Sequence, residues 1–343
     1  MADLQEMFRE ATDRVAPGHG ALDRQHRRQR QRRRRERGLV FGLTAALVAA
    51  FLTVIVATRS STPSAPADHG TSAPVVTSQP VLEEVDPVTG ATGTPLIREV
   101  APEQVDVSPD GSHIVFVRSR AGHDQLFLAN SDGTEISALT AANDVGCGCG
   151  VHEPDWAPDG TTIAFRGADL AGNQDIYVVD VGTGAVERIT TAPTYEGSPD
   201  WSPDGTTIAF TRGDGDHPSV WLIGAGEDSR AVRLSEGSAP AWSPDGQTIA
   251  FTRAAGTGDG SDIWTIATDG SSAEELTDRN EFDSTPAWLP DGTQIAFTAF
   301  RPGDDTPTAI AAVDLRTRQV YQLASGLSEP AWTPEGSLLA IRT

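Results

Sequence analysis

The chain has 343 residues, which is enough for one large domain with additional segments. Its formal net charge is −22 at pH 7, and the acidic excess lies in residues 61–343, whereas arginines concentrate near the N-terminus. An acidic region of this kind is unsuited to nonspecific nucleic-acid binding, and it favours cations, cationic partners or high solubility.

Residues 1–37 form an arginine-rich segment, with eight arginines between positions 27 and 37. Upstream of them, Leu4, Met7, Phe8, Ala11 and Val15 recur at helical spacing. The pattern predicts a short helix with one apolar face. Such a helix either binds a cytoplasmic regulator or lies on the inner leaflet of a membrane.

Residues 38–58 are 21 consecutive uncharged, largely apolar residues, enough to cross a bilayer as a helix. The preceding arginines predict a cytoplasmic N-terminus and an extracytoplasmic C-terminal region. A cleaved signal peptide is the alternative, but its apolar run is usually only about 7–15 residues, which favours an uncleaved anchor. Residues 59–79 are rich in Ser, Thr, Pro and Ala and predict a flexible stalk.

Residues 80–343 repeat one unit. It reads Trp-Ser-Pro-Asp-Gly-x-x-Ile-Ala-Phe-x-Arg at 201–212, recurs at 156–166 and 242–253, and has looser copies at 107–118, 288–298 and 332–342. The prolines of successive copies lie 41 to 49 residues apart. A period of this length made of short strands is typical of propeller blades. The sequence therefore predicts an all-β fold, a six-bladed β-propeller with four strands in each blade.

The last copy stops after its second strand. Residues 80–100 contain a strand, turn and strand pattern that matches the missing half. We therefore expect these residues to complete the last blade beside residues 328–343, which would close the ring and remove an open sheet edge.

The repeated unit resembles that of TolB-type propellers, and the resemblance covers residues 80–343. The resemblance implies a module that serves as a binding platform or as an accessory domain of an enzyme, and sometimes as an enzyme. It also implies a partner in the cell envelope.

The two cysteines, Cys147 and Cys149, are separated by one residue. Outside the cytoplasm thiols tend to oxidise, so a strained Cys-x-Cys disulfide is one interpretation. Free or intermolecular thiols, or a soft metal site that includes His152, are the alternatives.

One position distinguishes the repeats. The residue before the repeat's tryptophan (valine in the first copy) is aspartate in the first three copies and alanine in the last three: Asp106, Asp155, Asp200, Ala241, Ala287 and Ala331. Because this position lies on the innermost strand, the three carboxylates should gather on one side of the channel. Together with Glu153 they predict a site for a cation or cationic ligand, and their oxygen ligands suit Ca²⁺. No other cofactor is expected. The alternative role is hydrogen bonding to neighbouring strand ends.

Motifs for catalysis are missing from the sequence, since it has no Gly-x-Ser-x-Gly elbow, phosphate-binding glycine loop or HExxH. We therefore expect a membrane-anchored, extracytoplasmic binding or scaffold module with a protein or peptide partner in the envelope. One alternative is a hydrolase or lyase with a site at the channel mouth, built from His123, His152 and His217. Another is a transmembrane signalling receptor that uses the N-terminal helix.

Overall fold

The computed structural model describes residues 81–85, 103–120, 123–141, 150–169, 171–213, 217–226, 229–255, 260–279, 281–301 and 309–342. All of them belong to one compact unit, Val76–Thr343. The predicted cytoplasmic segment, membrane helix (38–58), stalk and cysteine pair lie outside these ranges. Within them, no helix has the length and apolar character that crossing a membrane requires.

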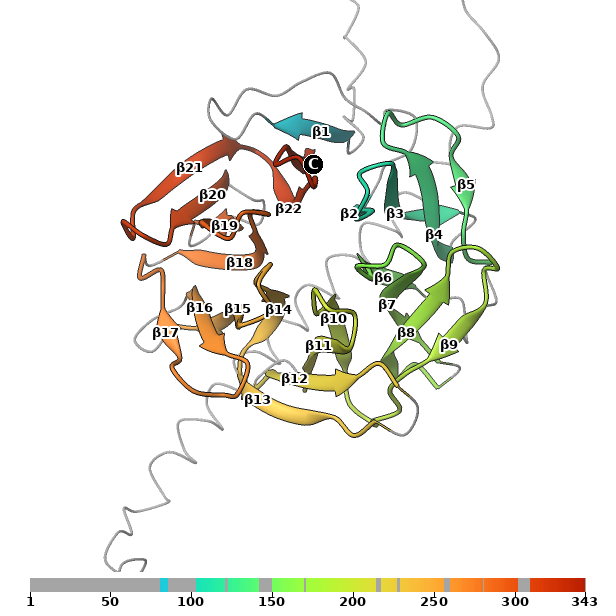
Figure 1. The fold of residues 1–343 in the computed structure, drawn as a ribbon, viewed down its shortest axis with the longest axis horizontal. Coiled ribbons are helices and arrows are strands. Elements are labelled where there is room, and N and C mark those ends of the chain that lie inside the picture. Colours follow the sequence, from blue (N-terminus) through green and yellow to red (C-terminus); the bar gives the residue numbers. More distant parts are fainter. Residues whose placement is uncertain are drawn as a thin grey trace, which may run out of the picture. The chain divides into compact units, whose positions relative to one another are not determined.

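Every regular element of the described ranges is a β-strand, and the strands are arranged in a ring (Figure 1). Repeat 1 comprises β2 (Glu103–Val107), β3 (His113–Arg120), β4 (His123–Asn130) and β5 (Ser137–Ala138). Repeat 2 comprises β6 (Val151–Trp156), β7 (Thr162–Ala168), β8 (Gln174–Asp180) and β9 (Val186–Arg188). Repeat 3 comprises β10 (Glu196–Trp201), β11 (Thr207–Arg212), β12 (Ser219–Gly224) and β13 (Val232–Glu236).

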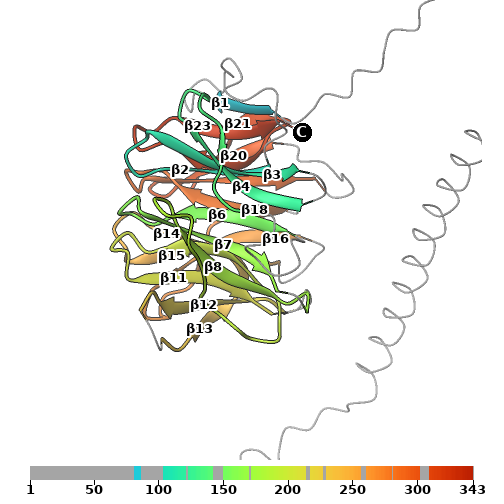
Figure 2. The ribbon, with the colours of Figure 1, turned by 90° about the vertical axis from the view of Figure 1, so that its right-hand side faces the viewer.

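The ring continues with the second half of the chain. Repeat 4 comprises β14 (Ser238–Trp242), β15 (Thr248–Ala254), β16 (Ser261–Ala267) and β17 (Glu274–Glu275). Repeat 5 comprises β18 (Phe282–Trp288), β19 (Gln294–Phe300), β20 (Ala309–Asp314) and β21 (Val320–Ser325). Repeat 6 comprises β22 (Ser328–Trp332) and β23 (Leu338–Arg342), and β1 (Val81–Val85) pairs with β23. The fold is thus an all-β propeller, seen from the side in Figure 2.

The hydrogen-bonded sheets differ from the six separate four-stranded sheets that the repeat predicts. Repeats 1, 2 and 3 each form a four-stranded sheet, but repeats 4 and 5 share one eight-stranded sheet. The two are joined by a single parallel pair, Ser261 with Phe282, where the chain enters β18 along the edge of β16. The hydroxyl of Ser261 also donates to the carbonyl of Asp283 at 2.9 Å.

The last sheet contains three described strands in the order β1-β23-β22. β1 runs antiparallel to β23, with Val81 opposite Arg342 and Val85 opposite Leu338. An N-terminal strand therefore joins the C-terminal repeat at the position predicted for a third strand. The predicted fourth strand, within 96–98, lies outside the described residues.

The turn after each innermost strand follows from its sequence. In repeat 3, Gly205 takes a φ of 71°, a conformation that glycine adopts without steric cost. The Asp204 carboxylate accepts from the backbone N–H of Thr206 at 3.0 Å and from the hydroxyl of Ser202 at 2.6 Å. These local bonds orient the first two strands of a repeat toward each other.

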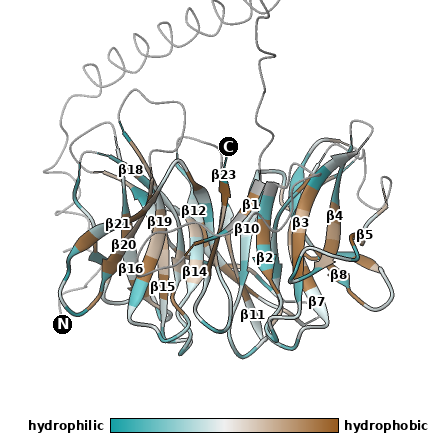
Figure 3. Ribbon diagram, turned by 90° about the horizontal axis from the view of Figure 1, so that it is seen from above, coloured by the Kyte–Doolittle hydropathy of each residue, from teal (hydrophilic) through white to brown (hydrophobic). Residues whose placement is uncertain are grey.

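The core lies between repeats rather than at one centre. Buried apolar side chains of the described residues form six clusters. Each cluster joins successive repeats, and its apolar residues come from strands that also carry hydrophilic residues (Figure 3). The second strand of repeats 1 to 5 supplies a fully buried phenylalanine: Phe116, Phe165, Phe210, Phe251 and Phe297. Because burial of apolar surface contributes about 25 cal/mol per Å², this interdigitation holds neighbouring repeats together.

Candidate functional site

The innermost strands β2, β6, β10, β14, β18 and β22 share an unusual backbone feature. Each has a register shift against its neighbouring strand, which marks a β-bulge. At each bulge one residue has a left-handed φ between 48° and 55°; these residues, the bulge ring, are Gln104, Glu153, Ser198, Ala239, Thr285 and Glu329. Such a conformation costs a non-glycine residue on the order of 1–3 kcal/mol, so its recurrence around the ring indicates a feature supported by the surrounding structure.

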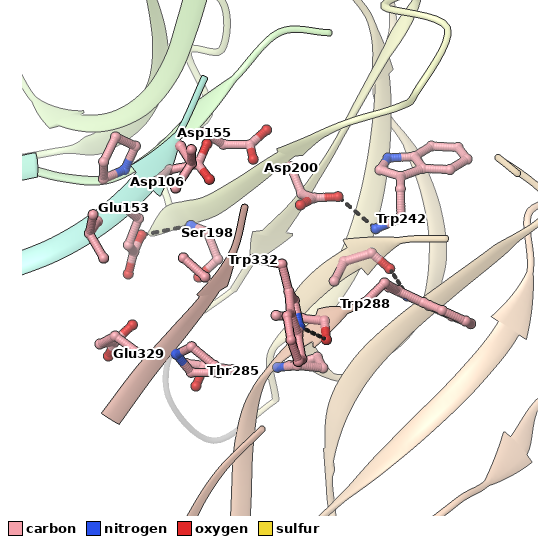
Figure 4. Close-up of a pocket in the computed structure, with 18 of the residues that line it drawn as sticks. Asp106, Glu153, Asp155, Ser198, Asp200, Trp242, Thr285, Trp288, Glu329 and Trp332 are labelled. Carbon is pink, nitrogen blue, oxygen red and sulfur yellow. Dashed lines mark hydrogen bonds between the residues drawn. The ribbon is translucent and has the colours of Figure 1, made fainter. Parts of the chain in front are cut away.

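Two residues beyond each bulge lies the position that distinguishes the repeats. The bulge ring and these six residues line one cavity of about 460 Å³ at the channel (Figure 4). Asp106, Asp155 and Asp200 form its aspartate side. Its alanine side comprises Ala241, Ala287 and Ala331. The structure thus brings the predicted carboxylates together in one cavity, while their role in binding stays a prediction.

The aspartates bind neighbouring strand ends. Oδ2 of Asp106 accepts a hydrogen bond of 2.8 Å from the backbone N–H of Trp156, in the next repeat. Asp155 accepts likewise from Trp201 at 2.6 Å. Hydrogen bonding to neighbouring strand ends, the alternative role predicted for these aspartates, is therefore present in the structure. Each aspartate links two repeats while it lines the channel.

The alanine side uses a different link. The indole N–H of Trp288 donates to the carbonyl of Ala241 at 3.0 Å, and that of Trp332 donates to the carbonyl of Ala287 at 3.2 Å. On the aspartate side, the tryptophan indole N–H groups are buried and have no acceptor among the described residues; they belong to Trp156, Trp201 and Trp242. Where the variable position is aspartate, its carboxylate accepts from the backbone N–H of the next repeat's tryptophan. Where it is Ala241 or Ala287, its backbone carbonyl accepts from the indole N–H of the next tryptophan.

Burial in the channel raises the pKa of its three aspartates. Burial raises the pKa of Asp106 to about 6, although hydrogen bonds from Trp156 and Val107 oppose the shift. Burial, with repulsion from Asp106, raises the pKa of Asp200 to about 8. The pKa of Asp155 lies well above its ordinary value, because it is buried and lies near both other aspartates. A cation beside these groups would favour their ionised forms.

Two glutamates of the bulge ring, Glu153 and Glu329, add further carboxyl groups to the channel. Glu153 Oε2 accepts from Arg166 Nε at 3.0 Å and from the backbone N–H of Ser198 at 2.7 Å. Burial, followed by repulsion from Glu153, raises the pKa of Glu329 to about 7. No described residue donates a hydrogen bond to the Glu329 carboxyl. Nor does any described cationic side chain form a salt bridge with it, so Glu329 contributes an unpaired carboxyl to the described channel lining.

Sequence reasoning missed most of the bulge ring. It identified Glu153 but not Gln104, Ser198, Thr285 or Glu329. The available signal was the proline that follows five of the six residues, since a residue before proline is disfavoured in the right-handed α region. Gln104, which precedes Val105, lacks this signal.

The described residues contain no group of three or more His, Cys, Asp or Glu side chains arranged to hold a metal ion. Calcium therefore stays a prediction, and the arrangement equally suits an ammonium or guanidinium group. His152 does not line the channel cavity: its Nε2 lies 3.6 Å from Oδ2 of Asp124, and burial together with Arg166 lowers its pKa. Cys147 and Cys149 lie outside the described residues.

Fold and channel together define a β-propeller with a ligand-sized cavity on its axis, lined by carboxylates on one side and mainly by apolar residues on the other. A family model described as the TolB beta propeller domain matches residues 98–238 and 198–343. The chain therefore belongs to the TolB beta propeller family.

Individual relatives agree with this assignment. A TolB homolog from Chlorobaculum tepidum is 31% identical over 75 residues, which are 22% of this chain and 16% of the relative. The chain thus matches only a small part of that protein's length. A TolB structure from Agrobacterium tumefaciens superposes with a TM-score of 0.65 at 21% identity, covering 77% of this chain and 98% of that one. TolB from Acinetobacter baumannii gives a TM-score of 0.56 at 21% identity, with 75% and 66% covered.

Proposed function

We propose that this protein is a non-enzymatic binding module whose channel mouth receives a cationic group of a protein or peptide partner in the cell envelope. The observation that carries the proposal is the asymmetry of the cavity. One side presents Asp106, Asp155 and Asp200, and the other presents alanines together with Trp288 and Trp332. Membership of the TolB beta propeller family supports a partner in the envelope.

The asymmetry suits a ligand with a charged end and an apolar body. Buried like charges are unfavourable unless a cation or hydrogen bonds compensate them. Each aspartate receives an N–H bond, but none forms a salt bridge with a described residue. A lysine, arginine or N-terminal ammonium group, or a calcium ion, would supply the missing charge.

The test separates charge from architecture. Asp→Asn replacement at positions 106, 155 and 200 keeps an acceptor for each tryptophan N–H and removes the charge. With a photo-crosslinking residue introduced at Ala287, we expect the original chain to capture its partner in cells and the Asn variant to lose it. Capture of the same partner by both forms would refute a charge-based channel site.

A matched control identifies nonspecific charge effects. Asp204, Asp245 and Asp269 lie in exposed turns and do not line the channel cavity. Their replacement by Asn removes at least as much negative charge from the molecule and should leave capture unchanged. Equal loss in both triple variants would indicate that only overall charge matters.

We further propose that the ring has six blades and that residues 38–58 anchor it in the cell membrane with the propeller outside. The single pair that joins repeats 4 and 5 supports counting them as two blades. The arginine run before the 21 uncharged residues supports the anchor and its orientation. The full chain should resist carbonate extraction from membranes, and external protease should reach the propeller in spheroplasts; release by carbonate would contradict the anchor.

A further inference from the structure

A second cavity opens beside the channel, between repeats 5 and 6. It has a volume of about 550 Å³ and is lined by Leu289, Pro290, Asp291, Gln294, Tyr321, Trp332, Pro334, Glu335 and Gly336. We call it the repeat 5–6 groove. Three of these residues, Pro290, Trp332 and Pro334, also line the channel cavity. The groove therefore leads outward from the channel mouth toward Tyr321 on β21.

The groove lies where contact between neighbouring turns is interrupted. In repeat 4, a Cβ placed on Gly246 would lie 3.2 Å from Pro203 of the preceding turn. The same contact measures 3.4 Å between Gly205 and Pro158. At Gly336, as at Gly160 in repeat 2, nothing lies within 4 Å of such a Cβ. The turn of repeat 6 therefore leaves space beside that of repeat 5.

The turn of repeat 6 contacts that of repeat 1, its other neighbour in the ring. Its sequence is Pro334-Glu335-Gly336, with glutamate where the other copies have aspartate. The Glu335 carboxylate lies 3.0 Å from the position that a Cβ on Gly111 would take. The longer side chain thus contacts the turn of repeat 1.

Tyr321 gives this groove an aromatic side chain at a position where repeats 1 to 4 have none. It lies opposite Ala312 in the sheet, and the residues at the same register in repeats 1 to 4 are Ser137, Glu187, Val232 and Glu274. Tyr321 is 38% exposed, and its hydroxyl donates to Oε1 of Gln294. This bond positions the ring, while the Gln294 amide N–H groups have no acceptor among the described residues.

We propose that the repeat 5–6 groove binds an extended, proline-containing segment of a partner protein with an adjacent basic residue. Segments in the polyproline II conformation make no internal hydrogen bonds, so their carbonyls are free to accept from a side-chain donor such as Gln294. Their prolines pack in aromatic-lined grooves of the kind formed by Tyr321 and Trp332.

Charge complementarity specifies the flanking residue. Asp291 and Glu335 lie in the groove lining, which contains no cationic side chain. Neither carboxylate forms a salt bridge with a described residue. A basic residue next to the proline segment would therefore meet an uncompensated negative potential, and its contribution should weaken as salt rises. The groove shares Pro290, Trp332 and Pro334 with the channel cavity, but none of the channel aspartates lines it.

The experiment uses a fluorescein-labelled, amidated peptide with the pattern Arg-Pro-x-x-Pro and the purified full-length chain, followed by fluorescence anisotropy. We expect saturable binding that weakens at least about 10-fold in Tyr321→Ser, as is usual when a central aromatic contact is removed. The matched control is Glu187→Ser, at the same sheet register in repeat 2. It should bind like the original chain. Unchanged thermal unfolding of both variants would verify that the fold is retained.

Further arms identify the ligand chemistry and the location. A peptide with alanine for proline, or glutamate for arginine, should bind several-fold more weakly. The Asp106/Asp155/Asp200→Asn variant should bind the original peptide normally. Undiminished binding to Tyr321→Ser, equal binding of the alanine peptide, or loss confined to the aspartate variant would overturn the proposal.

The chain's own prolines provide the last arm. Pro63, Pro66, Pro74 and Pro80 lie outside the described residues. If replacing them with alanine leaves peptide affinity unchanged, the partner assignment is supported. Tighter peptide binding to that variant would assign the groove to this segment of the chain and overturn the partner assignment.

Discussion

The backbone N–H of Trp242 donates a hydrogen bond of 2.6 Å to Oδ2 of Asp200, a channel carboxylate of the preceding repeat. One side chain therefore both lines the channel and fixes the start of the next repeat's turn. This double role means that removing charge and removing an acceptor are different perturbations, and substitutions can distinguish them.

Asp200→Asn and Asp200→Ala should change stability differently. Asparagine keeps an acceptor for Trp242 and removes a charge that burial disfavours, so unfolding at pH 8 should need more urea. Alanine leaves the buried N–H without its partner, which costs about 1–3 kcal/mol. It should therefore be less stable than Asp200→Asn by roughly that amount. Equal stability of the two variants would show that the hydrogen bond contributes little.

The free energy of unfolding should depend on pH because several buried carboxyl groups have raised pKa values. Asp106, Asp200 and Glu329 have pKa values of about 6, 8 and 7 in the folded protein, all above their ordinary values. Well below pH 4 these groups are protonated in both the folded and the unfolded state, and they do not affect the free energy of unfolding. As pH rises from about 4 to 8 the unfolded state loses their protons first, so the free energy of unfolding should fall.

The triple Asp→Asn variant provides the control for this pH dependence, because the acidic surface also repels itself more strongly at high pH. Urea unfolding of both proteins at several pH values would isolate the aspartate contribution as the difference between their curves. That difference should grow from pH 4 to pH 8. Parallel curves would contradict the raised pKa values of Asp106, Asp155 and Asp200.

Cation binding to the channel should release protons near pH 7. A positive charge beside Asp155 and Asp200 lowers pKa values that lie above ordinary, so protons leave as the ligand enters. Calorimetric titration with calcium chloride, and separately with an arginine-containing peptide, in two buffers of different ionisation enthalpy measures this release. Binding heats that are the same in both buffers would count against coupling to the aspartates.

The tryptophans should differ in the importance of their indole N–H groups. Trp332 donates to Ala287, whereas Trp201 at the equivalent position has no acceptor among the described residues. Replacement by phenylalanine removes similar ring volume from each. Trp332→Phe should therefore destabilise the protein more than Trp201→Phe, by about 1 kcal/mol. Urea unfolding measures this difference, and the reverse order would show that packing outweighs the hydrogen bond.

Several features could be predicted because they depend on local sequence. Pro-Asp-Gly specifies a tight turn through its own backbone and side-chain preferences, as the bonds of Asp204 and the φ of Gly205 show. Alternating apolar residues such as Ile208 and Phe210 specify a strand with a buried face. The recurrence of the unit every 41 to 49 residues then orders these units around a ring, which also predicts that the three aspartates lie on one side.

The parts that could not be predicted depend on contacts between repeats. The left-handed bulge that positions Glu329 in the channel and the shared edge of β16 and β18 arise from how neighbouring strands meet. Hydrogen bonds of the tryptophans likewise connect two repeats, through the backbone N–H of Trp242 to Asp200 and through the indole N–H of Trp332 to Ala287.

The sequence by itself determined that this protein is a β-propeller and where its repeats begin. It also determined that one position of the repeat is aspartate in three of the six copies. Only the tertiary structure decided that those carboxylates also bind the next repeat and that Glu329 joins them in the channel. It alone also decided that Tyr321 lines the repeat 5–6 groove. The physical reason is range: turn and strand preferences act over a few residues, whereas burial, pKa shifts and cavities are set by side chains about 45 residues apart in the chain.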